Sequence, residues 1–278
     1  MSAKASGVAA GSLAVDVTEV SRIFTGKKGA SVAALDNVSL TVNPGEFVSL
    51  IGPSGCGKST LMRLIADLDT PTSGTIEVFG QSARQARLNQ SYGIAFQQAG
   101  LLPWRTVAGN IELPLELHGV AKPARKARSA ELLDLVGLSD FAHHYPDQLS
   151  GGMQQRVAIA RSLAESPRLL LMDEPFGALD EMTRERMQNE LVRICGETGA
   201  AVVFVTHSIP EAVFLSDRVV VMSPRPGRIR DILSVRLGET GERGENLREE
   251  SSFFQAVSQV RELLHGEVPV GARGVETR

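Results

Sequence analysis

The chain contains 278 residues, of which 42% are hydrophobic and 22% are charged, and its formal net charge is -3. These values are ordinary for a folded protein, so they argue against disorder over the whole chain, and the near-neutral balance gives no support for broad electrostatic binding of nucleic acid. The sequence has two cysteines and no run of about 18 apolar residues, so we expect neither a disulfide framework nor a secretory signal or a membrane-spanning helix.

The N-terminal part of the chain reads mainly as strands. Residues 1–11 are small and polar, and we expect them to be mobile. Residues 13–24 and 38–42 alternate apolar and polar side chains, as half-buried strands do, whereas the continuous apolar run at 47–51 indicates a strand buried on both faces. Further predicted elements are a helix at 59–66 and strands at 75–79 and 94–96.

The character of the sequence changes to helical between residue 98 and about residue 165, as the apolar spacing over 126–135 indicates, and we interpret this stretch as an inserted helical subdomain. Buried strands then return, and strands that alternate with helices predict a parallel α/β sheet. The predicted elements of this part are strands at 169–172, 201–205 and 218–222 and a helix over 181–195.

The last stretch of the chain, residues 238–278, begins rich in Gly, Glu and Arg and then places apolar residues at helical spacing from Phe253 to Leu264. This pattern predicts one amphipathic helix. Packing of the helix on the parent domain is the simpler interpretation, and docking to a partner is the alternative.

A glycine-rich motif follows the strand predicted at 47–51. Residues 52–59 read Gly-Pro-Ser-Gly-Cys-Gly-Lys-Ser and match the pattern G-x-x-x-x-G-K-[ST]. Glycines allow the tight turn that aims backbone N–H groups at phosphate oxygens, and the start of the following helix adds its free N–H groups. Lys58 supplies a cation for the β- and γ-phosphates, and the hydroxyl of Ser59 can bind Mg²⁺. The predicted nucleotide-binding residues of this motif are Gly52, Pro53, Ser54, Gly55, Cys56, Gly57, Lys58, Ser59 and Thr60.

Two acidic residues end the apolar strand predicted at 169–172. Asp173 can approach the magnesium ion beside Ser59, and Glu174 then stands where it can orient or deprotonate a water that attacks the γ-phosphate. Water as the acceptor indicates hydrolysis. The phosphate loop alone leaves an ATPase, a GTPase and a kinase open, but the sequence shows neither a guanine-reading motif nor signs of a pocket for a phosphate acceptor.

A second candidate anion site lies at 149–156, which reads Leu-Ser-Gly-Gly-Met-Gln-Gln-Arg. Ser150, Gly151 and Gly152 precede a helix that we expect to begin near Met153, and a helix start offers free N–H groups and the positive end of the helix dipole. One chain therefore carries one phosphate loop and two phosphate-binding surfaces. The simplest interpretation is a head-to-tail pair of chains, in which the Ser150 segment of each closes on the γ-phosphate held by the other.

This segment resembles the signature of the ATP-binding cassette (ABC) family, and the resemblance covers roughly residues 13–230. It implies ATP as the nucleotide, together with Mg²⁺. It also implies that Gln97 contacts Mg²⁺ and senses a transmembrane partner, that Asp180 crosses the dimer interface, and that His207 contacts the γ-phosphate. Phe24 falls where the family places an aromatic ring that stacks on adenine, ordinary packing being the alternative.

Several features favour a transport ATPase within this family. The interval between Lys58 and Ser150 has room for a compact helical subdomain but not for the long coiled coil of DNA-repair and chromosome-organising members, and translation-type members usually carry two cassettes in one chain. Residues 97–104 and 222–228 are similar to ATPase subunits of nitrate, sulfonate and taurine importers. The partners implied are a second copy of the chain, an integral membrane permease and, indirectly, an external solute-binding protein, with no nucleic acid. The chain would be peripheral on the cytoplasmic face of the inner membrane.

Three apolar residues just after Gln97 are candidates for contact with the permease. We expect Leu101, Leu102 and Trp104 to help form a groove for a short cytoplasmic helix of that subunit. The alternative is that they belong to the local core of the helical subdomain.

The predicted fold is an α/β P-loop NTPase of the ABC type, with a mixed sheet, an N-terminal antiparallel β subdomain and an inserted α-helical subdomain. The ATPase domain is predicted at 12–237, with the helical subdomain at about 98–165. The functional alternatives are a cassette ATPase that acts on nucleic acid, an importer subunit for an unrelated small organic cargo, and a regulatory binder that senses ATP without turnover. The catalytic candidates are Glu174, His207 and Lys58, and the metal-ligand candidates are Ser59, Gln97 and Asp173.

Overall fold

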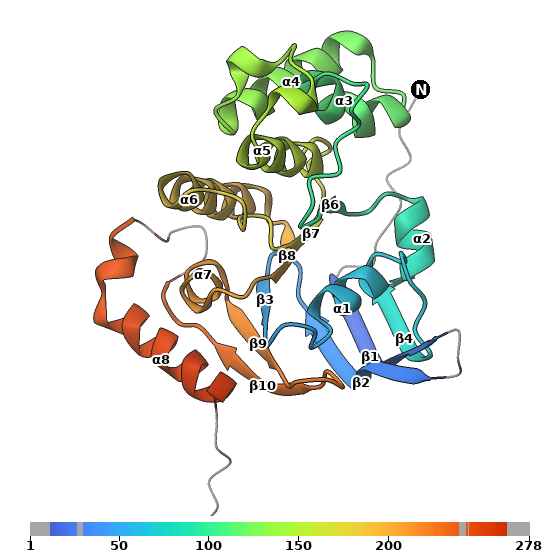
Figure 1. Ribbon diagram of the computed structural model, residues 1–278, viewed down its shortest axis with the longest axis vertical. Coiled ribbons are helices and arrows are strands. Elements are labelled where there is room, and N and C mark those ends of the chain that lie inside the picture. Colours follow the sequence, from blue (N-terminus) through green and yellow to red (C-terminus); the bar gives the residue numbers. More distant parts are fainter. Residues whose placement is uncertain (1–11, 27–29, 239–242, 244, 266–278) are drawn as a thin grey trace, which may run out of the picture.

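The computed structural model describes residues 12–26, 30–238, 243 and 245–265. The expectation for residues 1–11 therefore lies outside the described residues. The described part of the chain forms two sheets with helices around them, and a separate layer of helices covers one end of the molecule (Figure 1).

The larger sheet forms the centre of the molecule and has six strands (Figure 1). They are β3 (Phe47–Ile51), β6 (Gly93–Ala95), β7 (Leu169–Asp173), β8 (Ala201–Val205), β9 (Arg218–Met222) and β10 (Ile229–Ser234). Their order is β10-β9-β3-β8-β7-β6, and all neighbours are parallel except β10, which is antiparallel to β9. Every residue of β3, β7 and β8 is buried, as continuous apolar runs predict.

The smaller sheet comes from the N-terminal part of the chain and has four antiparallel strands in the order β2-β1-β4-β5. These are β1 (Val15–Thr25), β2 (Ser31–Val42), β4 (Ser73–Val78) and β5 (Gln81–Ser82). Strand β2 begins at Ser31 rather than at residue 38, because its first residues, Ser-Val-Ala-Ala-Leu, pair with β1 without alternating apolar and polar side chains. The antiparallel sheet beside a mixed sheet confirms the predicted fold class.

The described part of the chain has eight α-helices, most of them connecting strands of the large sheet. They are α1 (Lys58–Ile65), α2 (Ala83–Leu88), α3 (Val107–Leu117), α4 (Lys122–Leu135), α5 (Gly151–Ser162), α6 (Glu181–Thr198), α7 (Ile209–Leu215) and α8 (Ser251–His265). Short 3-10 helices include Ser139–Phe141, Pro146–Gln148 and Glu245–Glu249. Helices α3, α4 and α5 follow β6 in the chain and form the separate layer (Figure 1).

The two faces of the large sheet pack against different elements. Val48 and Leu50 of β3 join a core cluster with α1 and the strands of the small sheet. The alternate residues of the same strand, Phe47 and Ile51, join a second cluster with α5, α6 and α7. Because side chains alternate along a strand, burial of both sets places β3 between two hydrophobic layers. This packing holds in place the end of β3 from which the glycine-rich loop starts.

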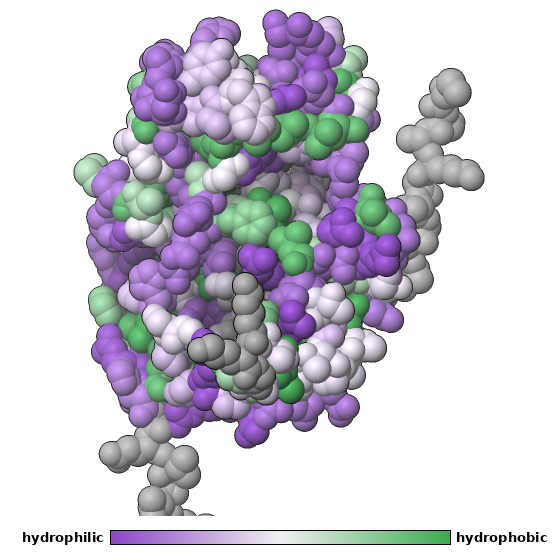
Figure 2. All heavy atoms as spheres, turned by 45° about the vertical axis from the view of Figure 1, so that its right-hand side comes forward, coloured by the Kyte–Doolittle hydropathy of each residue, from purple (hydrophilic) through white to green (hydrophobic). Residues whose placement is uncertain are grey.

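Hydrophobic side chains are exposed in a hollow on the surface of the molecule (Figure 2). Figure 2 shows mostly hydrophilic side chains on the face that it presents, with hydrophobic side chains gathered in the hollow below the helical layer. A cavity of about 230 Å³ lies in this region between α2, β6, α3 and α5.

The C-terminal helix α8 packs on the rest of the molecule. Its buried side chains Phe253, Val257 and Val260 belong to the same core cluster as Phe214 of α7. The amphipathic helix predicted from the sequence is therefore present, and its apolar side faces the parent domain. None of the helices described combines the length and the hydropathy that a bilayer crossing requires.

Candidate functional site

The glycine-rich loop connects the end of β3 to the start of α1. Gly55 and Gly57 have φ values of 75° and 103°, in the left-handed region that side chains disfavour. A Cβ atom on Gly52 would lie 2.8 Å from Sγ of Cys56 and 2.9 Å from the carbonyl oxygen of Met222, so this turn has no room for a side chain. Gly57 precedes α1 without a side-chain cap, which leaves the first N–H groups of the helix available to a ligand.

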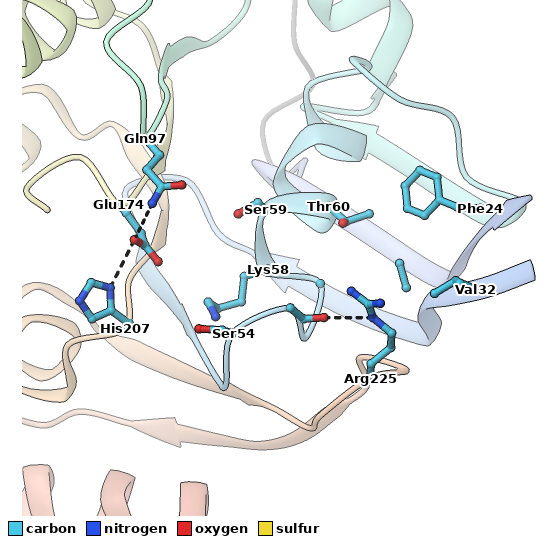
Figure 3. Close-up of a pocket in the computed structure, with 13 residues that line it drawn as sticks. Phe24, Val32, Ser54, Lys58, Ser59, Thr60, Gln97, Glu174, His207 and Arg225 are labelled. Atoms are coloured by element: carbon cyan, nitrogen blue, oxygen red, sulfur yellow. Dashed lines mark hydrogen bonds and ion pairs between the residues drawn. The ribbon is translucent and has the colours of Figure 1, made fainter. Parts of the chain in front are cut away.

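The side chain of Lys58 lies within this loop and is only 7% exposed. Its Nζ donates to the carbonyl oxygens of Gly52 at 2.7 Å and Pro53 at 3.2 Å. Figure 3 shows Lys58 between Ser54 and Ser59. The loop thus holds a cation at the place where a phosphate chain seated on it would lie.

Ser59 and Asp173 bring two oxygen atoms together at the carboxyl ends of the parallel strands. The hydroxyl of Ser59 donates to Oδ1 of Asp173 at 3.0 Å. Burial raises the pKa of the Asp173 carboxyl above its ordinary value, and the hydrogen bond from Ser59 opposes this shift. Neighbouring ligands of an octahedral Mg²⁺ ion are about 3 Å apart, and the ion prefers hard oxygen ligands, so this pair fits magnesium.

Glu174, Gln97 and His207 meet at the same edge of the sheet (Figure 3). Oε2 of Glu174 accepts a hydrogen bond from Nε2 of Gln97 at 3.1 Å and lies 3.3 Å from Nδ1 of His207. Glu174 has a φ of 46°, an uncommon value for a residue with a side chain, and its N–H donates to the carbonyl oxygen of Val205 at 2.9 Å. Such backbone strain persists where the surrounding structure imposes it, as at functional sites.

The phosphate loop and the cluster of Glu174, Gln97 and His207 line one cavity of about 660 Å³. Phe24 lies at the opposite end from Glu174 and His207 (Figure 3). It is 41% exposed, and the guanidinium carbon of Arg22 lies 4.5 Å from the centre of its ring. The cavity is lined by Phe24, Val32, Ala34, Ser54, Gly55, Gly57, Lys58, Ser59, Thr60, Gln97, Glu174, His207 and Arg225.

The structure does not bring the Ser150 segment to this cavity. Ser150 caps α5, because its Oγ accepts a hydrogen bond from the N–H of Met153 at 3.3 Å. Helix α5 therefore begins at Gly151, two positions before the expected start. A Cβ atom on Gly152 would lie 3.1 Å from the carbonyl oxygen of Ala178, so the helix start packs against the 178–180 turn.

Asp180 also lies outside the cavity and caps the next helix. Its Oδ1 accepts a hydrogen bond from the N–H of Thr183 at 3.0 Å at the start of α6. This backbone hydrogen bond lowers the pKa of the Asp180 carboxyl. Asp180 and the start of α5 thus form one exposed region, separate from the phosphate loop of the same chain.

Helix α5 holds the chain segment that follows β6. Nε2 of Gln155 donates to the carbonyl oxygen of Phe96 at 2.9 Å. The guanidinium of Arg161 donates to the carbonyl oxygens of Ala99 at 2.8 Å and Gly100 at 2.9 Å. Gln97 therefore lies on a segment that α5 binds on both sides of it.

Sequence reasoning missed two parts of this site. Arg225, from the turn between β9 and β10, reaches the cavity although it is 170 positions from Gly55, whose carbonyl oxygen it contacts. Next to His207, the buried carboxylate of Glu211 accepts hydrogen bonds from the Thr206 hydroxyl and, at 2.9 Å, from Nε2 of Gln188. Burial raises the pKa of the Glu211 carboxyl, although the two hydrogen bonds act to lower it. Only the motif at 222–228 could have pointed to Arg225, and its spacing gave no sign of where the turn folds.

The mixed sheet, the phosphate loop and the acidic strand end together define a P-loop NTPase with an inserted helical layer. The comparison with solved structures agrees. The chain is similar to the dimeric structure of MJ0796, a bacterial ABC transporter cassette, with a TM-score of 0.75 and 37% identity over 80% of this chain and 99% of that one. A structure of the same cassette in a post-hydrolysis state bound to ADP and Pi matches with a TM-score of 0.74 and 36% identity, over the same shares of both chains.

A sequence profile of the ABC transporter family matches residues 35–177, and the chain belongs to this family. It is 47% identical to a nitrate import ATP-binding protein of Synechocystis over 91% of this chain and 95% of that protein. It is also 45% identical to a taurine import ATP-binding protein of Rhizobium johnstonii over 90% of this chain and 95% of that protein. These findings confirm the family that the motifs predicted.

Proposed function

We propose that this chain is the ATP-hydrolysing subunit of an ABC importer and works with a separate membrane permease. The observation that carries the proposal is the convergence on one cavity of a buried lysine, a hydroxyl that donates to the buried carboxylate of Asp173, and a second carboxylate held by a glutamine and a histidine. This is the set of groups that positions a triphosphate and activates a water against it.

Each of these groups has a proposed role in the reaction. The loop N–H groups and Lys58 bind the β- and γ-phosphates, and Phe24 receives the adenine ring. Glu174 orients the attacking water and accepts its proton, and Gln97 and His207 hold the carboxylate in place. His207 and Lys58 also stabilise the charge that develops on the phosphoryl group. Ser59 and Asp173 would hold Mg²⁺, assisted by Gln97, and the ion supplies electrostatic stabilisation of the phosphate oxygens.

The complete site requires a second copy of the chain. Ser150 and Gly151 are exposed, and neither lines the cavity of its own chain. A helix start with free N–H groups is a binding surface for an anion. In a head-to-tail pair, the Ser150 segment of each chain would close on the γ-phosphate in the other, with Asp180 at the interface. The solved cassette to which this chain is similar is dimeric, which supports the arrangement.

The hollow below the helical layer is the proposed docking site of the permease (Figure 2). Its apolar lining includes Ile94 of β6 and Leu117 of α3, and the side chain of Leu117 is 70% exposed. None of the three residues expected to form the groove lines this cavity: Trp104 is 71% exposed, and Leu101 and Leu102 are half-buried. A short cytoplasmic helix of the permease that covers this surface would contact the segment that carries Gln97.

The cargo is proposed as a small anionic or zwitterionic solute such as nitrate, a sulfonate or taurine. The support is indirect: relatives at 45–47% identity are nitrate and taurine import ATP-binding proteins. The cargo would be delivered by an external solute-binding protein and would pass through the permease, with this chain peripheral on the cytoplasmic face of the inner membrane.

The experiment that tests the proposal separates hydrolysis from transport. The purified chain with MgATP and no acceptor should release free phosphate and ADP, and hydrolysis should rise when the chain is assembled with its permease in vesicles. Uptake of nitrate and of taurine is then measured in the same vesicles. Phosphate release that requires an added acceptor, or stimulation by DNA or RNA instead of the permease, would contradict the proposal.

A further inference from the structure

The turn between β9 and β10 lies directly against the phosphate loop. The N–H of Gly227 donates to the carbonyl oxygen of Ala34 at 2.9 Å, and the carbonyl oxygen of Gly227 accepts from the N–H of Asp36 at 3.0 Å. A Cβ atom on Gly227 would lie 1.9 Å from the carbonyl oxygen of Cys56. Only glycine fits this position, so the turn touches both β2 and the phosphate loop without a side chain between them.

Further contacts fix the conformation of this turn. The N–H of Ser223 donates to the carbonyl oxygen of Arg228 at 2.9 Å and closes the turn. Oγ of Ser223 donates to the carbonyl oxygen of Pro226 at 3.2 Å. On the outer side, Nε of Arg228 donates to Oδ2 of Asp36 at 2.9 Å. The residues at the tip of the turn are therefore held at a defined position relative to the loop.

Arg225 is at this tip and extends into the cavity. Its Nε donates to the carbonyl oxygen of Gly55 at 3.3 Å, and it lines the same cavity as Phe24 and Lys58. In Figure 3 the guanidinium lies between the phosphate loop and Val32, on the side of Lys58 that faces Phe24 and away from Glu174. A guanidinium has five N–H donors, so the contact to Gly55 leaves donors for a ligand.

We propose that Arg225 is a nucleotide-binding residue that contacts the sugar–α-phosphate part of the ATP bound in its own chain. This inference rests on the proposed nucleotide site. A nucleotide with its base on Phe24 and its terminal phosphate near Glu174 places the α-phosphate and ribose in the middle of the cavity, opposite Arg225. There the guanidinium adds a second cation to Lys58 and forms charge-assisted hydrogen bonds with phosphate oxygens.

The test compares the affinities of two nucleotides for Arg225→Gln. Glutamine keeps an N–H donor for the carbonyl oxygen of Gly55 and removes the charge. Titration calorimetry with MgADP and with a non-hydrolysable MgATP analogue should show a loss of roughly 10-fold for both, because both contain the α-phosphate. Arg225→Lys should recover part of this loss. The matched control is Arg84→Gln, on the exposed surface of α2 and outside the cavity lining, which should bind both nucleotides as the wild type does.

The outcomes distinguish this inference from the proposed function. If the wild-type chain binds neither nucleotide, the proposed function fails and the inference fails with it. If the wild type binds both and Arg225→Gln binds equally well, only the role of Arg225 is overturned. A loss confined to the ATP analogue would also overturn it, because that result places the guanidinium at the γ-phosphate. Thermal unfolding without nucleotide should be unchanged in Arg225→Gln, which separates lost binding from damage to the loop.

Discussion

The phosphate loop and the start of α5 are both glycine-rich turns that lead into a helix, yet the chain surrounds them differently. Around the phosphate loop, Lys58 of α1 and Glu174 after β7 line one cavity, and Asp173 at the end of β7 accepts a hydrogen bond from Ser59. At the start of α5, the hydrogen bonds that Ser150 makes among the described residues go to Met153 and Gln154 of its own helix, and a Cβ atom on Gly151 would meet nothing within 4 Å. The phosphate loop is surrounded by functional groups of its own chain, whereas the start of α5 is exposed, and we propose it as an anion-binding surface. The difference supports the proposal that a second chain completes the site.

The largest expected effect comes from replacing Glu174, the carboxylate that lines the cavity. Glu174→Gln should lower the rate of hydrolysis by about 10²- to 10⁴-fold, because an amide cannot accept the proton of the attacking water. ATP affinity should persist, and ATP-bound dimers should accumulate. Phosphate release and size-exclusion chromatography with ATP measure both effects. Glu131→Gln, an exposed carboxylate on α4, is the control that should change neither. Near-normal hydrolysis in Glu174→Gln would remove this residue from the role of base.

The next effect probes the open turn. Ser150→Arg should reduce hydrolysis by roughly 100-fold, because a bulky side chain blocks approach to a nucleotide held by the second chain. Binding of ATP to the separate chain should remain within about 2-fold of the wild type, as Ser150 lies outside its own cavity. Ser139→Arg, exposed elsewhere in the helical layer, should leave hydrolysis intact. If Ser150→Arg abolishes binding to the monomer, the two turns belong to one site and the comparison is wrong.

A smaller effect concerns the free energy of unfolding, which burial of the Asp173 carboxylate lowers. Burial raises the pKa of Asp173, so the folded state favours its protonated form and the wild-type chain loses stability as pH rises through that raised pKa. Asp173→Asn has no such loss and keeps an oxygen for the Ser59 hydroxyl. Without nucleotide it should be more stable than the wild type at pH 7 by up to about 1 kcal/mol, with a smaller difference near pH 4. Urea unfolding across this range measures the difference, and a variant less stable at pH 7 would refute the argument. Mg²⁺-dependent ATP binding should weaken in the same variant.

The smallest effect separates capping from function in the helical layer. Ser150→Ala removes the cap of α5, and Thr106→Ala removes the equivalent cap of α3, where Oγ1 accepts from the N–H of Gly109 at 3.1 Å. Each should cost about 1 kcal/mol of stability. Only Ser150→Ala should also lower hydrolysis, by a few-fold. Equal hydrolysis by the two variants would reduce Ser150 to a structural cap.

The sequence predicted most of the large sheet because buried parallel strands are continuous apolar runs. Strand β10 (Ile229–Ser234) was missed, since it lies at the edge of the sheet and is mostly exposed, with little hydrophobic signal. Helix α7 (Ile209–Leu215) was missed because its seven residues, with Pro210 near the start, are too few to show a helical period. Short and exposed elements are set by contacts distant in sequence, which local patterns do not contain.

The residues of the candidate site also fall into those that local motifs predict and those that only the folded structure reveals. Motifs located Lys58, Asp173 and Glu174, because phosphate chemistry restricts residue types at fixed spacing. Arg225 carries no such restriction: it reaches the cavity because Gly227 packs against Cys56, a contact between segments far apart in the chain. The roles that the family resemblance implies for Phe24, Gln97, His207 and Asp180 stay predictions.

Helix α5 has a mechanical consequence. Its first residue follows Ser150, and its side chains Gln155 and Arg161 hold the backbone on either side of Gln97. Because an α-helix moves nearly as a rigid body, a displacement of its first residues also moves the segments that its side chains hold by hydrogen bonds. In the proposed dimer, motion of Ser150 toward the second chain would therefore pull Gln97 relative to Glu174. A force that a membrane subunit applied to the Gln97 segment would be transmitted along α5 in the opposite direction.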